Sequence, residues 1–182
     1  MRDNQVCNYV AREETVLIRK AELADLERLL EIYNYEVEHG WATMDLVPKT
    51  LEQRRLWFDS YNIEGDNHPL IVAVADDGCV VGYASLSKFR QKDGYKSTVE
   101  LSIYVHQDYR RQGFATKLMA ELLDIARADE QTHVVTSIIA ESNAGSKALH
   151  KKFGFTLCGT IRQAAHKFDQ YHDISQYQII VG

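Results

Sequence analysis

A basic turn near the middle of the chain contains residue types that bind phosphate. Residues 110–116 read Arg-Arg-Gln-Gly-Phe-Ala-Thr and lie between an alternating strand pattern and a helix-like pattern. The first amide groups of a helix have no partner inside it, and the helix dipole places about half a positive charge there. Gly113 allows the backbone to approach a ligand closely, and Arg110 and Arg111 add positive charge. The turn therefore predicts a phosphate site, although an ordinary strand-to-helix loop with surface arginines would contain the same residues.

A second stretch, residues 143–155, places polar side chains on one face of a short helix. Asn143 is a good N-cap residue, and Ser146 and His150 follow at intervals of three and four residues, so all three share a face. Leu149 and Phe153 form a neighbouring apolar stripe. The plain alternative to a functional site is a capped amphipathic helix with an exposed histidine.

Strands and helices alternate along the chain and must position these residues. Apolar alternation predicts strands, and apolar spacing of three to four residues predicts helices. An Asp-Asp-Gly turn at 76–78 joins two strands, and we expect a loop through residues 163–173. This order predicts a mixed α/β sheet with helices on its faces, as one domain over residues 15–182 after a lead-in at 1–14. The expected strands are 16–19, 70–75, 80–86, 99–105, 134–140, 156–162 and 174–181, and the expected helices cover 24–38, 51–58, 115–126 and 143–154.

Composition and charge narrow the class of protein. The chain has 182 residues, of which 45% are apolar and 26% charged, which is ordinary for one globular domain. A formal net charge of −5 argues against a nucleic-acid or membrane-surface partner. The longest apolar run, residues 70–75, is far too short to span a membrane, and three scattered cysteines indicate reduced thiols in a cytoplasmic protein. His166, His172 and Asp173 lack the ligand spacing of a metal site.

Two motifs resemble those of a known superfamily. Arg110, Gly113 and Ala115 fit Arg-x-x-Gly-x-Ala, the pyrophosphate turn of the GNAT acetyltransferases, and fit neither common nucleotide fingerprint. Residues 143–155 resemble a second GNAT motif, in which His150 takes the place of a tyrosine, and the two motifs have the order and spacing of that superfamily. The resemblance implies the GNAT fold, a mostly antiparallel sheet that is splayed at its middle with helices on both faces. It also implies acetyl-CoA as co-substrate and no metal.

From residue 15 onward the chain resembles one branch, the phosphinothricin and methionine sulfone or sulfoximine acetyltransferases. The matching segments are 32–34, 57–58, 68–73, 82–85, 89–90, 98–100 and 103–105. The branch acetylates small amino-acid analogues and forms homodimers, which implies a small amine acceptor and a homodimer here. The chain departs from the branch around the expected acceptor pocket, which leaves the acceptor open. The departures include Gln91, Lys92, Asp169 and Tyr171.

The resemblance implies direct attack of a free amine on acetyl-CoA. Glu100 points away from the apolar side of its strand, where a partly desolvated carboxylate could take the amine proton. Alternatively, Glu100 is structural and pairs with Arg90 or Lys96. His150 could give the departing thiolate a proton, or could only anchor the pantetheine arm.

The remaining expected site residues fall into two groups. The acceptor residues are Phe89, Arg90 and Lys167; Arg90 is expected to pair with the acceptor carboxylate, although it could equally be a solvated loop arginine. The residues expected to bind acetyl-CoA are Ile103, Tyr104, Val105, Arg110, Arg111, Gln112, Gly113, Phe114, Ala115, Thr116, Asn143 and Ser146.

Other functions remain open at this point. The acceptor could instead be a protein N-terminus or a polyamine. The protein could also be a non-catalytic sensor of acetyl-CoA on the same fold, but Glu100 and His150 argue against this, because a sensor needs neither.

Overall fold

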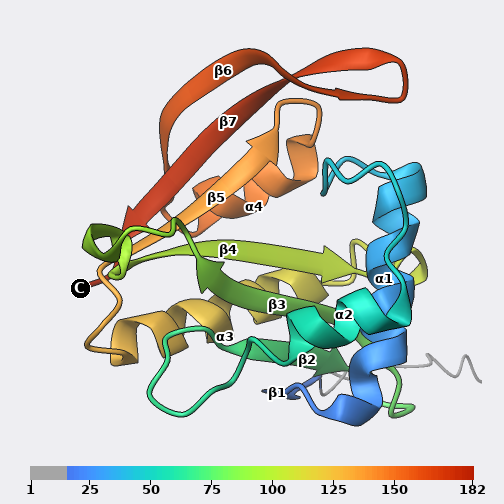
Figure 1. The fold of residues 1–182 in the computed structure, drawn as a ribbon. Helices are drawn as coiled ribbons and strands as arrows, with labels where there is room; N and C mark the ends of the chain where they lie inside the picture. The colour runs from blue at the N-terminus through green and yellow to red at the C-terminus, as the bar shows by residue number, and fades with distance from the viewer. Residues whose placement is uncertain (1–15) are drawn as a thin grey trace, which may run out of the picture.

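The computed structural model describes residues 16–182, which form one open sheet of seven strands with four α-helices. The strand order is β1-β2-β3-β4-β5-β7-β6, and all neighbours are antiparallel except β4 and β5 (Figure 1). The expected mixed sheet is confirmed, and the lead-in predicted at residues 1–14 lies outside the described residues. The strands are β1 (Leu17–Lys20), β2 (Leu70–Val74), β3 (Val80–Lys88), β4 (Thr98–Val105), β5 (Val134–Ala140), β6 (Thr156–Lys167) and β7 (Gln170–Ile180); the helices are α1 (Leu26–His39), α2 (Leu51–Phe58), α3 (Phe114–Ala128) and α4 (Ala144–Lys152).

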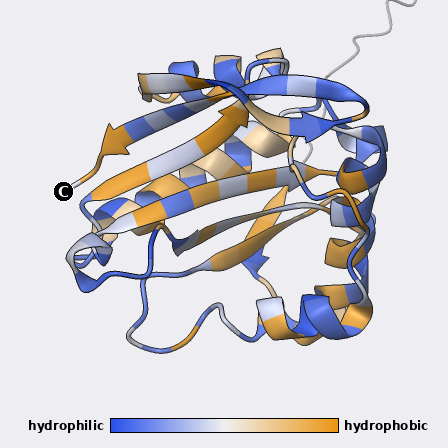
Figure 2. Ribbon diagram, turned by 45° about the horizontal axis from the view of Figure 1, so that its top comes forward, coloured by the Kyte–Doolittle hydropathy of each residue, from blue (hydrophilic) through white to orange (hydrophobic). Residues whose placement is uncertain are grey.

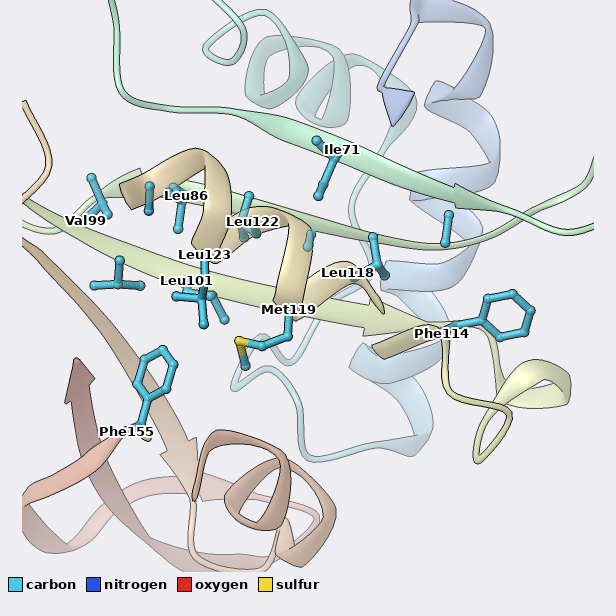
Figure 3. Packing of buried hydrophobic residues seen from close by; sticks show 14 of the residues in the cluster. Ile71, Leu86, Val99, Leu101, Phe114, Leu118, Met119, Leu122, Leu123 and Phe155 are labelled. Carbon is cyan, nitrogen blue, oxygen red and sulfur yellow. The ribbon is translucent and has the colours of Figure 1, made fainter. Parts of the chain in front are cut away.

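Helices cover both faces of the sheet. The apolar side of α3 packs on one face of β3 and β4, where Leu118, Leu122 and Met119 are fully buried near Leu86 and Leu101 (Figure 3). Helices α1 and α2 cover the opposite face (Figure 1). Hydrophobic residues gather on the central strands, whereas the connection between α2 and β2 is largely hydrophilic (Figure 2). No helix within the described residues is long and apolar enough to cross a membrane.

The sheet is split between β4 and β5. These parallel strands pair only over Thr98–Glu100 and Val134–Thr136. Beyond these residues β4 remains paired with β3 and β5 with β7, so the two strands diverge toward their carboxyl ends (Figure 1). The predicted split is confirmed, and it leaves the backbone of β4 after Leu101 without a strand partner on its β5 side.

The prediction of a loop through residues 163–173 is wrong. Strands β6 and β7 extend through this region and meet at a tight turn, Phe168-Asp169, where φ is 51° and 55°. Positive φ at both central residues is typical of a type I′ hairpin turn, which the sequence did not signal because neither residue is glycine or asparagine. The strand expected at 156–162 continues as β6 to Lys167, and residues 163–166 of this extension are exposed or only partly buried, so no apolar alternation marked it.

Candidate active site

A cavity of about 490 Å³ opens where β4 and β5 separate. Its walls are the free edge of β4, the end of α1, the first turn of α3, the end of β5 and the start of α4. All of the residues expected to bind acetyl-CoA line it except Gln112, whose side chain donates a hydrogen bond to the Asp108 carbonyl on the surface. The cavity also reaches His150.

The phosphate turn forms the mouth of this cavity at the start of α3. Gly113 is the N-cap residue, with φ 89° and ψ −6°, and no side chain caps the helix. A side chain is strained at this φ, which explains the glycine. Nothing lies within 4 Å of the position that a Cβ would occupy at Gly113. Gly113 and the three residues after it line the cavity, so the first amides of α3, which have no partner inside the helix, could hold a diphosphate there.

Arg110 does not contribute a free positive charge to this turn. Its guanidinium forms an ion pair with Glu36, which is 7% exposed at the end of α1. Its Nε also lies 3.3 Å from the Val105 carbonyl oxygen, and the guanidinium lies over the Tyr35 ring. Arg111 is exposed and forms no ion pair among residues 16–182. The formal charge available to a phosphate here is therefore that of Arg111.

His150 is buried, so the alternative of an exposed histidine is wrong. Its side chain is 4% exposed, and Nδ1 lies 2.8 Å from the Ser146 carbonyl oxygen, which can only accept a hydrogen bond. Burial lowers the pKa of His150, although the Ser146 carbonyl opposes this. The neutral ring therefore carries its proton on Nδ1, and Nε2 is an acceptor.

The partner of Nε2 is Ser137, which the sequence analysis did not identify. Its Oγ lies 2.9 Å from Nε2 of His150 and 3.2 Å from the carbonyl oxygen of Leu101. A serine has one hydroxyl proton, so it serves only one of these acceptors at a time. Ser137 also lines the cavity, just past the point where the strands separate. It thus lies between His150 and the other wall of the cleft.

Glu100 has no ion-pair partner among the described residues. Its pKa is raised by burial. Lys96 pairs with Asp93 at 3.1 Å, and Arg90 stacks over the rings of Phe89 and Tyr95. The alternative in which Glu100 is a structural partner of Arg90 or Lys96 is therefore not what the structure contains.

A second cavity, of about 460 Å³, lies on the other side of β4, beneath α1 and α2. Its floor is a row of antiparallel pairs on one face of the sheet: Tyr83 with Tyr104, then Ser85 with Ser102. The next pair in the row is Ser87 with Glu100, so Glu100 lies on this face, about 7 Å along the strand from Ser102. Ser102 and Tyr104 line both cavities. Glu100 itself lines neither cavity, but it is two residues from Ser102, which lines both, on the same face of β4.

The three expected acceptor residues are not brought together. Phe89 and Arg90 follow β3 and line neither of these two cavities. Lys167 is 2% exposed, and its ammonium donates to the carbonyl oxygens of Glu36 at 3.0 Å and Thr43 at 2.9 Å. Burial lowers its pKa. Lys167 thus fastens the β6–β7 hairpin to the end of α1, and two of its three donors are used within the protein.

Known proteins resemble this chain over most of its length. Residues 9–155 match the model of the acetyltransferase (GNAT) family. The L-methionine sulfoximine/L-methionine sulfone acetyltransferase of Pseudomonas aeruginosa is 37% identical over 162 residues, which cover 89% of this chain and 92% of that protein. A crystal structure of a ribosomal-protein-alanine N-acetyltransferase from Brucella melitensis has a TM-score of 0.85 and 41% identity, covering 90% of this chain and 99% of that one. A phosphinothricin acetyltransferase from Sinorhizobium meliloti in complex with AcCoA has a TM-score of 0.87 and 32% identity, covering 92% and 89%.

Proposed function

Because this chain belongs to the GNAT acetyltransferase family, we propose that it transfers the acetyl group of acetyl-CoA directly to the α-amine of a small amino acid or amino-acid analogue. The observation that carries this proposal is Glu100, a partly buried carboxylate that forms no ion pair within residues 16–182 and lies on the same face of β4 as Ser102, which lines both cavities. The relatives named for methionine sulfone, methionine sulfoximine and phosphinothricin support the acceptor class.

Acetyl-CoA fits the cleft through backbone groups more than through side chains. We place its diphosphate at the amides that follow Gly113, with Arg111 beside it. The pantetheine arm would lie along residues 103–105 of β4 like an added strand, because that edge has no strand partner. Asn143 caps α4 through its side chain, which accepts from the Ser146 amide at 3.1 Å, and its amide nitrogen is left for the arm.

Glu100 is the proposed general base. An α-amine is mostly protonated near neutral pH and must lose a proton before it can attack. A carboxylate whose pKa is raised by burial accepts that proton more readily than an exposed one. The amine lone pair then forms the C–N bond, the C–S bond of the thioester breaks, and CoA leaves as a thiolate. The nitrogen loses its second proton as the amide forms, and the thiolate takes up a proton to give the CoA thiol.

Ser137 is the proposed hydrogen-bond donor to that thiolate. His150 in its neutral form has no proton on Nε2, so it cannot act directly as the acid that the sequence analysis expected. The Ser137 hydroxyl can turn from Nε2 of His150 toward the sulfur. On this proposal His150 positions Ser137 and anchors the wall of the cleft.

The test is release of free CoA with a panel of amines. Methionine sulfone, methionine sulfoximine and phosphinothricin represent the proposed class, a peptide that begins with alanine represents protein N-termini, and spermidine represents polyamines. Turnover with the amino-acid analogues supports the proposal. Tight acetyl-CoA binding with no turnover on any amine would instead indicate a non-catalytic sensor.

A second candidate is acetylation of a protein N-terminus. The name of the Brucella melitensis structure, at 41% identity, favours it. This reading predicts that the alanine peptide is used better than any free amino acid in the same assay.

We further propose that the protein is a homodimer. Apolar side chains on β5 and on the β6–β7 hairpin are exposed, and pairing with a second copy would bury them. Light scattering at micromolar concentration should give twice the monomer mass, and a monomer mass would contradict the proposal. The exposed apolar side chains are Ile138, Leu157, Ile161, Phe168 and Tyr171.

A cytoplasmic location is also proposed. Cys79 and Cys158 are exposed free thiols, which persist in a reducing compartment. Fractionation of the native host, with detection of the protein in the cytoplasmic fraction, checks this.

A further inference from the structure

Arg54 is a buried arginine for which residues 16–182 provide no carboxylate. The side chain is 4% exposed, and one of its terminal nitrogens, Nη2, donates to the Tyr83 hydroxyl at 2.6 Å. Its Nε is buried without any hydrogen-bond partner. Buried charges in proteins are normally paired, and buried donors are normally satisfied. Arg54 therefore lacks the acceptor that its position requires.

Aromatic rings surround the faces of this guanidinium, but ring faces do not accept hydrogen bonds from the N–H groups at its edge. Its central carbon lies 3.3 Å from the ring centre of Trp57, 4.6 Å from that of Tyr33 and 5.2 Å from that of Tyr83. Ring faces stabilise a cation. The N–H groups of a guanidinium lie in its own plane, where they match the two oxygens of a carboxylate. The rings therefore orient Arg54 in the wall of the second cavity and leave its Nε–H without an acceptor.

Arg54 lines the second cavity and carries a positive charge that no negatively charged residue of the lining neutralises. The other two charged residues of the lining, Lys49 and Asp45, pair with each other at 2.8 Å. Tyr33 donates to Asp45 at 2.6 Å, and burial together with Asp45 raises the pKa of Tyr33 to about 12, so it stays protonated. The charges of the lining therefore leave one positive charge, which suits a ligand with one carboxylate.

We propose that Arg54 binds the α-carboxylate of the acceptor, so that the substrates are free amino acids with an uncharged side chain. This inference rests on the proposed N-acetyltransferase function. Tyr83 links Arg54 to the cleft, because its ring stacks on Tyr104, which lines both cavities. A carboxylate held at Arg54 leaves the amine free to extend toward Ser102 and Glu100. A peptide N-terminus has an uncharged amide in place of the carboxylate, and its chain would continue into the buried guanidinium.

The test compares L-methionine sulfone with its primary carboxamide, which keeps the amine and side chain but removes the carboxylate charge. The wild type should use the acid with a kcat/KM about 100-fold above that of the amide, the scale of a lost charge-assisted hydrogen bond. Arg54→Gln should bring the two values close together, mainly by raising the KM for the acid. Arg54→Lys keeps the charge without the planar edge and should retain part of the preference. Arg55→Gln is the matched control, because Arg55 lies next to Arg54 on α2 but is exposed and pairs with Asp59.

Three results would overturn the inference. One is an Arg54→Gln variant that keeps the wild-type preference for the acid. Another is an Arg90→Gln variant that abolishes the preference for the acid, because this would show that Arg90 binds the acceptor carboxylate. The third is a wild type that prefers the amide or an alanine peptide.

Calorimetry separates failure of this inference from failure of the proposed function. L-methionine sulfone is titrated into protein that is saturated with CoA, so no turnover is needed. Binding that weakens about 100-fold in Arg54→Gln supports the carboxylate site even if no acceptor is acetylated. Binding equal in the wild type and Arg54→Gln overturns it whatever the turnover. An unchanged acetyl-CoA affinity in each variant shows that the fold is intact.

Discussion

The hydroxyl oxygen of Ser137 lies 2.9 Å from Nε2 of His150, at the point where β4 and β5 separate. The imidazole proton is held on Nδ1 by the Ser146 carbonyl, so the hydroxyl is the donor in this pair. The pair belongs to β5 and α4, and it faces the cavity in which we place the thioester. In this arrangement the serine, rather than the histidine, has a proton to donate to a departing sulfur.

Replacing Ser137 by alanine tests this arrangement. Ser137→Ala should lower kcat about 10-fold, because one hydrogen bond to a developing negative charge is lost. The affinity for acetyl-CoA should change little, since the thioester itself is uncharged. Steady-state kinetics and calorimetry measure the two quantities. Loss of affinity without loss of kcat would show that Ser137 only supports the cofactor.

A substitution at Gly113 tests whether the turn before α3 binds the phosphates of acetyl-CoA. Gly113→Glu places bulk and negative charge at the first amides of α3, so the affinity for acetyl-CoA should fall by about 100-fold or more. Gly78→Glu is the matched control: φ is 83° at Gly78 and 89° at Gly113, and both positions open onto free space. Because φ is similar at the two glycines, a calorimetric difference between the two variants reports on the ligand site rather than on a glutamate at positive φ. Equal affinities would remove the phosphate assignment.

A substitution at Glu100 tests whether this residue is the general base. Glu100→Gln should lower kcat by about 100-fold or more, the usual scale of general-base catalysis. Because burial raises the pKa of Glu100, wild-type kcat should fall with decreasing pH at a higher pH than an exposed glutamate would give. That acidic limb should be absent in the variant. A variant with most of the wild-type rate and the same pH profile would show that Glu100 has a structural role and is not the base.

The same carboxylate has a predictable effect on stability. A glutamate whose pKa is raised by folding holds its proton more tightly in the folded state, so its ionisation destabilises the fold as pH rises above the ordinary glutamate range. Glu100→Gln should therefore have a melting temperature at pH 7 that is equal to or above that of the wild type. The gain should vanish at low pH, where both side chains are neutral. Thermal denaturation across pH measures this, and a lower melting temperature at pH 7 would indicate a lost structural contact.

The last prediction concerns which side chain the enzyme prefers in its acceptor. Phosphinothricin carries an anionic phosphinate in addition to its α-carboxylate, whereas the side chain of methionine sulfone is neutral. The second cavity has one unbalanced cation, Arg54; Lys92 is exposed, and Lys167 is buried outside the lining of that cavity, where it donates to two backbone carbonyl groups. The kcat/KM with methionine sulfone or sulfoximine should therefore be at least equal to that with phosphinothricin. A clear preference for phosphinothricin would require a second cation at the site.

The features that the sequence determined by itself are local ones. Gly113 lies in the turn that leads into α3, as the pattern predicted, and Asn143 caps α4 through its own side chain. Strand β5 has the predicted bounds, Val134–Ala140. Such features depend on a few consecutive residues, whose periodicity and capping follow from the backbone geometry of that segment alone.

The chemistry within the cavities was decided by the tertiary structure. Arg110 and Glu36 are 74 residues apart, and only the packing of α1 against the phosphate turn brings their charges together. Arg54 meets Tyr83 because α2 lies over the row of side chains on β3, and Ser137 meets His150 because β5 and α4 pack together. Lys167, expected in the acceptor site, is instead held by two carbonyl groups near the end of α1. A side chain's partner depends on the register and packing of segments that are distant in the chain, and one sequence read along its length contains no signal for that distance.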